Sequence, residues 1–485
     1  RLDCNGLDMR YLFVDEFQDT DATQIRTFAS LAQTIGARLF VVGDVKQSIY
    51  AFKGATDEAF DILESEMRGK LRYYSLRNNY RTCANIMKIM EKYFFAWSEE
   101  GLLRYEESVR PFKKDDGEIY MEMIYRKDEI PSQTLQAIDQ ALQELELDIR
   151  SGKKKVSEKT KVAVIVRGNK KAAEIAELCR ANGKTVVLNS DRPFFLSQAV
   201  RDFYAMISSY LFADQPAYRY NYLMTPYAAY DGVISITEME RLQGDQRALQ
   251  EYLQNFTVHT NWHKYQREFR IRPVLSVIRD IVENENVMEN YIAMDKAQMS
   301  GEDWTEAKKN RQALIDAKSY QMNLDKLMEM IQQRMDGEFT TLYDLYVYLS
   351  LMISSNREEM EPDIDMVDDY TSVYIMTVHK SKGLEYDTVI MPAMNGKLIP
   401  NEQTAILAND RKAAWYYRKN ASEHMNSAWY EELHREAVRK GVEEETRMLY
   451  VAMTRAVNKL VLLVNNWDFY ESWSSLIRKV GLMNE

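Results

Sequence analysis

Two adjacent carboxylates, Asp15 and Glu16, directly follow a short apolar run near the start of the sequence. The run 11–14 favours a strand, and the amphipathic segment after Asp21 favours a helix. Acids at the carboxyl end of a strand can share the work of nucleotide hydrolysis, because one can hold Mg²⁺ while the other activates a water molecule. Acids near a helix start also interact well with the helix dipole, so the pair by itself leaves a purely structural role open.

A second polar segment, GDVKQSIYAFKGA, follows the next strand-like run at 38–42. Gln47 could sense a γ-phosphate or orient an attacking water by hydrogen bonding. Three residues of the segment suit the stacking of unpaired bases and the binding of backbone phosphate: Tyr50, Phe52 and Lys53. The alternative is that both aromatic side chains are buried in a core.

Three further segments contain residues that could contact a base or a phosphate. In LRNNYRT, Tyr80 could stack on a purine and Arg81 could bind a phosphate through its forked guanidinium group. The segment TVHKSKGLE leaves a strand-like run through a polar loop that contains His379. The helix-like segment ETRMLYVAMT places Arg455 where a second arginine could reach a phosphate from another domain. Each has an ordinary structural alternative: a packed tyrosine, a loop histidine, or a cation at a helix end.

The elements that would position these residues alternate between strand and helix. A helix is expected over 170–181, and strand-like runs occur at 162–166, 185–188, 374–378, 388–391 and 459–464. Ligands of open α/β sheets bind at the carboxyl ends of the strands, where the polar segments fall. The stretch 195–360 is rich in Tyr, Met and Gln at helical spacing and is expected to be a helical insertion. Residues 393–442 are expected to form a mostly helical insertion too, and Lys153–Lys155 a solvated loop.

The composition of the 485 residues sets broad limits on function. A net charge of −11 argues against a simple nucleic-acid coat, although a local basic groove stays open because net charge averages over the whole surface. Three cysteines without CxxC spacing favour a reducing, cytoplasmic setting over a disulfide framework or a zinc site. The sequence has no apolar run long enough to span a bilayer, so we expect no membrane partner.

In their joint order, the segments resemble motifs II to VI of superfamily 1 DNA helicases of the UvrD/Rep type. The resemblance rests on DEFQDT, VGDVKQSIY, NNYRT, TVHKSKGLE and LYVAMTRA, and it extends over nearly the whole chain. The segment GDVKQSIYAF and the long gap before the last motif are more similar to those of the AddA/RecB branch. The resemblance implies an α/β fold of RecA-like P-loop NTPase motor domains. The first would be partial at 1–80, the second would occupy 81–194 and 361–485, and a 2B-like helical insertion would lie at 195–360.

The same resemblance implies a role for each motif residue, with ATP and Mg²⁺ as cofactors. Asp15 would associate with Mg²⁺ and Glu16 would activate water. The other implied nucleotide contacts are Gln47 as γ-phosphate sensor, Tyr80 as adenine-stacking residue, Arg81 and Arg455 as the arginines that stabilise transition-state charge, and Gly383 and Glu385 as further contacts. The implied DNA contacts are Tyr50, Phe52, Lys53, Thr377 and His379. Lys53 stands where arginine is commoner in the family, and it keeps the charge but loses the planar fork.

The 485 residues contain no match to the phosphate loop G-x-x-x-x-G-K-[ST] that the family has ahead of its carboxylate pair. The tripeptide Gly183-Lys184-Thr185 is a false match, because Leu178 stands where the first glycine is needed and the tripeptide leads from a helix into a strand. We therefore expect a fragment that lacks the Walker A region and hydrolyses ATP negligibly by itself.

The resemblance further implies that the intact protein is an ATP-dependent DNA helicase or translocase. It would act on single-stranded or duplex-junction DNA, move 3′ to 5′, and serve DNA repair or recombination. Two alternatives stay open: a non-catalytic DNA-binding or regulatory relative that has lost its phosphate loop, and a component of a complex with a nuclease partner.

Overall fold

The computed structural model describes two compact units, Arg1–Ile175 with Asp368–Glu485 (unit 1) and Ala176–Val367 (unit 2). The described residues are 9–56, 58–106, 108–113, 117–228, 234–258, 260–335, 341–355, 359–362, 369–398, 404–408, 412–420, 423–467 and 471–481. Among them, no helix is long and apolar enough to cross a membrane.

The main sheet of unit 1 is parallel, with strand order β5-β13-β9-β6-β8. The strands are β5 (Glu118–Ile124), β6 (Val162–Val166), β8 (Val373–Thr377), β9 (Tyr386–Met391) and β13 (Ala456–Asn465). Every residue of β6, β8 and β9 is buried, as expected for central strands of a parallel sheet that are covered on both faces. The structure confirms four strands that the sequence predicts and adds β5, whose side chains are only partly buried.

Helices surround this sheet in unit 1. They are α3 (Ala84–Glu99), α4 (Ile130–Arg150), the first part of α5 (Asn169–Ala181), α15 (Val378–Ser381), α16 (Tyr430–Met453) and α17 (Trp473–Lys479); the residues of α5 from Ala176 on belong to unit 2. The helix predicted over 170–181 is confirmed. One loop differs from expectation, because the ammonium of Lys154 donates to Asp387 at 2.8 Å and its side chain is only 24% exposed. The loop 153–155 is therefore tied to the start of β9 rather than solvated throughout.

A smaller α/β layer at the start of unit 1 carries the carboxylate pair. Its strands β1 (Tyr11–Val14) and β2 (Arg38–Val41) are parallel, and its helices are α1 (Ala22–Ile35) and α2 (Ala59–Met67). Asp21 begins α1 with a capping box to Gln24, and Gly36 ends it in a left-handed conformation, which glycine adopts without a Cβ clash. Short 3₁₀ turns lie at η1 (Phe17–Asp19), η2 (Val45–Gln47) and η3 (Ala51–Lys53), and β3 (Asn78–Asn79) pairs with β4 (Arg110–Pro111).

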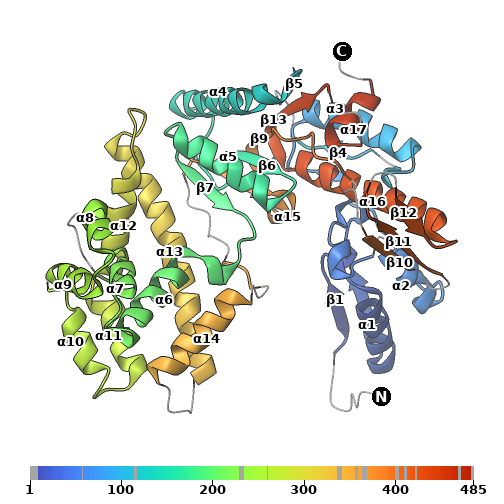
Figure 1. The fold of residues 1–485 in the computed structure, drawn as a ribbon. Helices are drawn as coiled ribbons and strands as arrows, with labels where there is room; N and C mark the ends of the chain where they lie inside the picture. Colours follow the sequence, from blue (N-terminus) through green and yellow to red (C-terminus); the bar gives the residue numbers. More distant parts are fainter. Residues whose placement is uncertain are drawn as a thin grey trace. The chain divides into compact units, whose positions relative to one another are not determined.

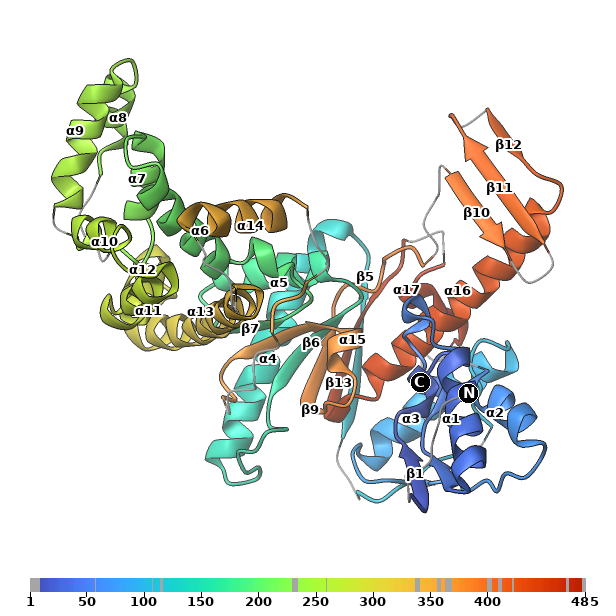
Figure 2. The same cartoon turned by 90° about the horizontal axis from the view of Figure 1, so that it is seen from below.

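The region 393–442 is not mostly helical, which corrects the expectation from sequence. It forms an antiparallel sheet of β10 (Thr404–Ala408), β11 (Ala413–Arg418) and β12 (His424–Asn426) before α16 begins. Figure 2 shows this sheet beside the first part of α16. Ala414 and Tyr416 alternate with exposed residues along β11 and contact Tyr430 and Leu433 of α16. This period-two pattern is short, which is why helix and strand are hard to separate from sequence there.

Unit 2 is mostly helical in its described residues (Figure 1). After β7 (Val186–Asn189) and η5 (Phe194–Leu196) it contains α6 (Gln198–Leu211), α7 (Pro216–Leu223), α8 (Ile236–Leu242), α9 (Gln246–Thr257), α10 (Trp262–Glu268), α11 (Val274–Asn284), α12 (Val287–Gln298), α13 (Glu306–Met335) and α14 (Leu342–Ser354). One cluster of buried apolar residues joins these helices, with Phe203, Trp262 and Leu327 among its fully buried members. The helical spacing predicted for 195–360 is thus confirmed for these helices, whereas its assignment as an inserted subdomain, like the other domain boundaries, stays a prediction.

Candidate functional site

The carboxylate pair lies in the turn that follows β1. Asp15 and Glu16 are both exposed, and Glu16 has a left-handed backbone conformation with φ 47°, which is uncommon outside glycine. Asp15 Oδ1 accepts a hydrogen bond from the Glu16 N–H at 2.9 Å. The Phe17 N–H donates to the Val42 carbonyl at 2.8 Å, so the turn is tied to the residue that follows β2.

Gln18 connects this turn to the polar segment after β2. Its side chain is buried, its Nε2 donates to Glu16 Oε2 at 2.5 Å, and its Oε1 accepts from the Asp44 N–H at 2.9 Å. Gly43 packs so closely on this amide that an added Cβ would lie 2.5 Å from Gln18 Oε1. A side chain at 43 would therefore displace this amide and crowd the backbone nitrogens of Phe17 and Gln18, which lie 3.1 Å from the same Cβ.

Lys382 joins the loop after β8 to both of these segments, and the sequence reasoning assigned it no role. Its ammonium donates to Asp19 Oδ1 at 2.7 Å and Oδ2 at 2.6 Å and to the Gln47 carbonyl at 3.0 Å. It also lies 3.7 Å from Glu16 Oε2 and 5.0 Å from the centre of the Tyr50 ring. Its side chain is only 8% exposed. The sequence signal for Lys382 was its position in the segment TVHKSKGLE, but sequence spacing alone could not show which groups its ammonium would contact.

Burial of Asp19 raises the pKa of its carboxyl, and the hydrogen bond and charge of Lys382 oppose that rise. Charge–charge attraction is strong in such a partly dry environment. The ion pair thus holds the carboxylate turn of one α/β layer against a loop of the other.

Gln47 lies in η2 and is half-buried. Its Nε2 donates to Asp44 Oδ2 at 3.1 Å, while the ammonium of Lys46 lies 2.6 Å from Asp44 Oδ1. Its carbonyl is held by Lys382, so Gln47 and Glu16 contact the same ammonium group.

Arg81 contacts two motifs that are distant from it in sequence. Its Nε donates to Glu385 Oε2 at 3.0 Å and its Nη1 to the Thr454 carbonyl at 3.4 Å. Burial alone would raise the pKa of Glu385, but hydrogen bonds and charges from Lys159 and Arg81 outweigh it and lower that pKa. Glu385 is therefore ionised and holds Arg81 beside the end of α16.

Arg455 is almost completely buried at that same end. Its Nε donates to the Val451 carbonyl at 2.9 Å and its Nη1 to the Leu384 carbonyl at 3.2 Å. Burial, followed by the nearby charge of Arg81, lowers the pKa of Arg455 to about 10. The guanidinium of Arg455 stays charged at neutral pH, and the structure brings it close to Arg81, whose own charge is paired with Glu385.

The predicted aromatic contacts form a cluster around His379. The ring of His379 lies 5.6 Å from Tyr50 and 5.3 Å from Phe52, centre to centre, and its Nε2 is 3.1 Å from the Ile49 carbonyl. The ammonium of Lys53 lies 4.7 Å from the centre of the Tyr50 ring. Phe52 is 68% exposed, so the alternative of a core residue does not hold for it.

The remaining predicted residues lie at turns. Tyr80 is 62% exposed and its ring lies 4.9 Å from that of Phe112. Thr377 is the N-cap of α15, where its side chain accepts from the Lys380 N–H, and Gly383 has φ 80°. Direct contacts link the loop that contains His379 to Glu16 and Gln47. Tyr80 makes no hydrogen bond or ring contact with any of these within the described part of the chain.

The donor set at the turn is compatible with a hard cation. Asp15 offers one exposed carboxylate, and Mg²⁺ in nucleotide sites is commonly held by one or two carboxylates together with water and phosphate oxygens. Across the described residues, no group of three or more His, Cys, Asp or Glu side chains is arranged to hold a metal ion.

Two models of protein families match the chain. The UvrD-like helicase C-terminal domain matches residues 74–466, and the UvrD/REP helicase N-terminal domain matches residues 7–68. These ranges contain all the motifs described above.

Curated relatives match over most of the chain at low identity. RecBCD enzyme subunit RecB of Escherichia coli K12 is 22% identical over 92% of the chain and 36% of its own length. ATP-dependent DNA helicase Rep of Buchnera aphidicola subsp. Schizaphis graminum is 22% identical over 93% of the chain and 61% of its own length. One subunit of the ATP-dependent helicase/nuclease of Staphylococcus aureus MRSA252 is 23% identical over 93% of the chain and 39% of its own length. The chain thus spans less than two thirds of each of these relatives.

Proposed function

The chain belongs to the UvrD-like helicase family, and from this premise we propose that it is the C-terminal portion of an ATP-dependent DNA helicase or translocase that acts on single-stranded DNA. The observation that carries the proposal is the Lys382 junction. It brings Glu16 and Gln47, at the strand ends of one α/β layer, against the loop that follows β8 of the other.

In the proposed reaction, Glu16 accepts a proton from the attacking water. Gln18 orients the carboxylate of Glu16 by donating to Oε2, so the other oxygen stays available to the water. Gln47, whose carbonyl contacts the same ammonium group as Glu16, can orient the same water or contact the γ-phosphate. When bound, Mg²⁺ neutralises charge on the phosphates, and Asp15 is the residue that would hold it.

Arg81 and Arg455 are the proposed source of positive charge in the transition state. Both are held rigidly by carbonyls or by Glu385, so little reorganisation is needed when negative charge develops. Arginines in this role are typically worth about 10³ to 10⁵ in rate. Tyr80 and Glu385 are proposed to contact the base and the ribose-phosphate part of the nucleotide, with Gly383 giving close backbone approach.

We propose that the aromatic cluster contacts DNA. Phe52 offers an exposed face, Lys53 supplies a cation beside it, and His379 connects both to the loop that carries Lys382. Stacking on aromatic side chains with nearby cations is how single strands are commonly bound without sequence preference. Because the same loop touches Glu16 and Gln47, DNA contact and nucleotide chemistry would be coupled through it. Movement from 3′ to 5′ and a role in repair or recombination are proposed on family membership.

One face of the β1–β2 sheet is exposed, and this supports the proposal that further polypeptide completes this chain. Tyr11, Phe13, Phe40 and Val42 on that face are 45–70% exposed, and the rings of Phe13 and Phe40 stack at 5.1 Å. Parallel strands are normally buried on both faces. We infer that an α/β segment that carries the missing phosphate loop covers this face in the intact protein, and that the chain alone hydrolyses ATP negligibly.

A second proposal concerns partners. Two of the relatives above are named as parts of RecBCD enzyme and of an ATP-dependent helicase/nuclease. The chain keeps Glu16, Gln47, Arg81 and Arg455, so a nuclease-bearing partner fits it better than a non-catalytic role would. Co-purification of a nuclease with the full-length gene product tests this, and a monodisperse full-length protein without nuclease activity would contradict it.

The ATPase proposal is tested with the chain and with the full-length gene product, each with and without single-stranded DNA. We expect activity only from the full-length protein and its loss in Glu16→Gln. Robust DNA-stimulated hydrolysis by the chain alone, abolished by Glu16→Gln, would contradict the inactivity of the chain. A full-length gene product with no phosphate loop would contradict the ATPase assignment itself.

The DNA proposal is tested by fluorescence anisotropy with a labelled single-stranded oligonucleotide. Phe52→Ala should weaken binding about 5- to 150-fold, since base stacking is worth about 1–3 kcal/mol. Tyr125→Ala is the matched control, because Tyr125 is similarly exposed at 65% in the same unit but lies outside the cluster. Equal effects of both substitutions would argue against a specific stacking site.

A further inference from the structure

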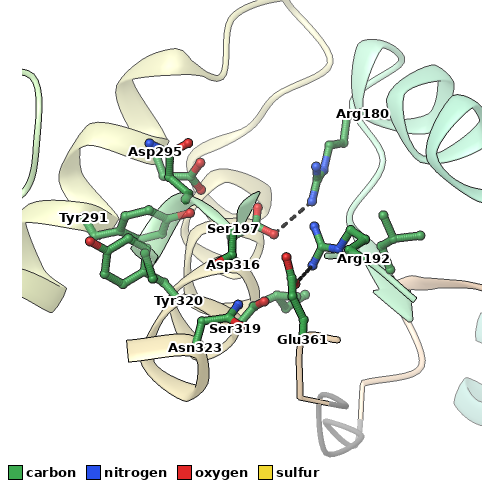
Figure 3. Close-up of a pocket in the computed structure, with 14 residues that line it drawn as sticks. Arg180, Arg192, Ser197, Tyr291, Asp295, Asp316, Ser319, Tyr320, Asn323 and Glu361 are labelled. Carbon is green, nitrogen blue, oxygen red and sulfur yellow. Dashed lines mark hydrogen bonds and ion pairs between the residues drawn. The ribbon is translucent and has the colours of Figure 1, made fainter. Parts of the chain in front are cut away.

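A cavity of about 160 Å³ lies in unit 2, and none of its lining residues belongs to a motif described above. Its walls come from the end of α5, the segment before α6, and helices α12 and α13. Eleven of its fourteen lining residues are polar or charged, and Figure 3 shows ten of them with labels. At a liquid volume of about 30 Å³ per molecule, the space corresponds to about five waters, or to one small organic ligand.

The charges around the cavity do not balance. Arg180 Nη2 donates to Asp316 Oδ1 at 2.9 Å, and Arg192 Nη2 lies 2.6 Å from Glu361 Oε2; both pairs are drawn in Figure 3. These two pairs leave Asp295 as a third carboxylate with no ion pair among the described residues. The cavity therefore carries one excess negative charge when all its acids are ionised.

Three oxygens that line the cavity have no hydrogen-bond partner among the described residues: Asp295 Oδ2, Asn323 Oδ1 and Ser197 Oγ. The side chains of Asn323 and Ser197 are at least 95% buried. Leaving a buried polar group without a hydrogen-bond partner is unfavourable, and more so for a charged group. The terminal torsions of Asp and Asn are broad, so these oxygens can turn toward a bound group at low cost.

Two tyrosine rings complete the lining on the side of Asp295. Tyr291 and Tyr320 have ring centres 4.3 Å apart and both border the cavity. Aromatic faces attract cations, as do unpaired carboxylate and amide oxygens. The Nε–H groups of Arg180 and Arg192 are also without partners among the described residues, but each arginine is already neutralised by its own carboxylate.

We propose that this cavity binds a small organic cation with a primary ammonium group, such as an alkylamine or diamine, with Asp295 as its counter-ion. An ammonium group donates hydrogen bonds and accepts none, and the cavity lining offers three oxygen acceptors without partners among the described residues. Its positive charge cancels the excess negative charge, and an alkyl stem packs against the tyrosine rings. Water alone would satisfy hydrogen bonds but would leave the charge of Asp295 uncompensated in a partly buried site.

Burial raises the pKa of the Asp295 carboxyl to about 6, and the charge of Asp316 adds to that rise while Arg180 opposes it. Binding of an ammonium group is therefore best measured above that pKa, at about pH 8, where Asp295 is ionised.

The test uses isothermal titration calorimetry of the whole chain at pH 8 with three probes: butane-1,4-diamine, n-butylamine and n-butanol. We expect saturable binding of one amine per chain and at least tenfold weaker binding of n-butanol, which matches n-butylamine in size but lacks the charge. Asp295→Asn should weaken amine binding at least tenfold. Glu251→Gln is the control, because it removes one exposed carboxylate from α9 of the same unit.

Absence of saturable amine binding to the unsubstituted chain would overturn the proposal and leave the cavity to water. Equal binding of n-butanol and n-butylamine, or unchanged affinity in Asp295→Asn, would also overturn it. The comparison of probes on the unsubstituted chain decides the matter even where Asp295→Asn fails to fold, and no outcome bears on the ATPase assignment.

Discussion

The ion pair between Lys382 and Asp19 allows a sharp prediction. Lys382→Met removes the ammonium group but keeps much of the apolar stem. It leaves Asp19, whose side chain is 24% exposed, without its cation, and it removes the donor to the Gln47 carbonyl. We expect the carboxylate turn and the η2 segment to lose stability together.

The magnitude follows from the geometry. Two unit charges 2.6 Å apart attract by about 6 kcal/mol at an effective dielectric constant of 20. Desolvation of both groups and residual exposure of Asp19 offset much of this. Loss of one partner from a buried pair typically costs about 3–5 kcal/mol, so we expect about 2–4 kcal/mol for this partly buried pair.

The penalty should depend on pH. Burial already raises the pKa of Asp19 above its usual value with Lys382 present, and loss of the ammonium group raises it further. The destabilisation caused by Lys382→Met is therefore largest where Asp19 is ionised, near pH 8, and it shrinks as the pH falls through the raised pKa. Asp19→Asn in the same chain should recover most of the loss.

The assay is a double-mutant cycle of Lys382→Met and Asp19→Asn at pH 8 and pH 5. Urea unfolding should be combined with hydrogen exchange of peptides from 11–20 and 45–53, because a chain with two units need not unfold in one transition. Lys153→Met is the control, since Lys153 is 66% exposed in its pair with Asp148 and such surface pairs are worth about 0–1 kcal/mol. A coupling energy below about 0.5 kcal/mol, or equal at both pH values, would refute the reasoning.

Three further outcomes are expected. Burial raises the pKa of Asp202 to about 6, so this group stabilises the fold only while it is protonated. The free energy of unfolding should therefore fall by about 3 kcal/mol as the pH rises from about 4 through 6. Asp202→Asn should remove this pH dependence in urea unfolding. Gly43→Ala should cost about 1–3 kcal/mol through overpacking, whereas Gly168→Ala, with no atom within 4 Å of its added Cβ, should cost less than 1 kcal/mol in the same measurement. Replacing Phe13 and Phe40 by serine should reduce self-association of the chain in sedimentation velocity, since exposed apolar patches promote association; unchanged sedimentation would argue that the face stays free.

The strands and the first helix could be predicted because their signals are local. Asp21 and Gly36 mark both ends of α1, and continuous apolar runs mark β6, β8 and β9. The β10–β12 sheet could not be predicted in the same way. Its strands are short, and Tyr416 is on the inner face only because α16 presents Tyr430 to it.

The sequence by itself determined the family, because five ordered motifs are specific together, and it supplied the candidate residues from Asp15 to Arg455. Only the tertiary structure decided which of them touch. It put Gln18 and Lys382 at the centre of the carboxylate turn, because a buried amide and a buried ammonium group must find partners that are distant in sequence. It also separated Phe52, which is exposed, from the core aromatics, since exposure depends on neighbours that no local pattern specifies. Asp15 and Glu16 were recognisable from their position after a strand, but Glu16 also contacts Lys382 from a loop far away in sequence, which only the folded chain brings to it.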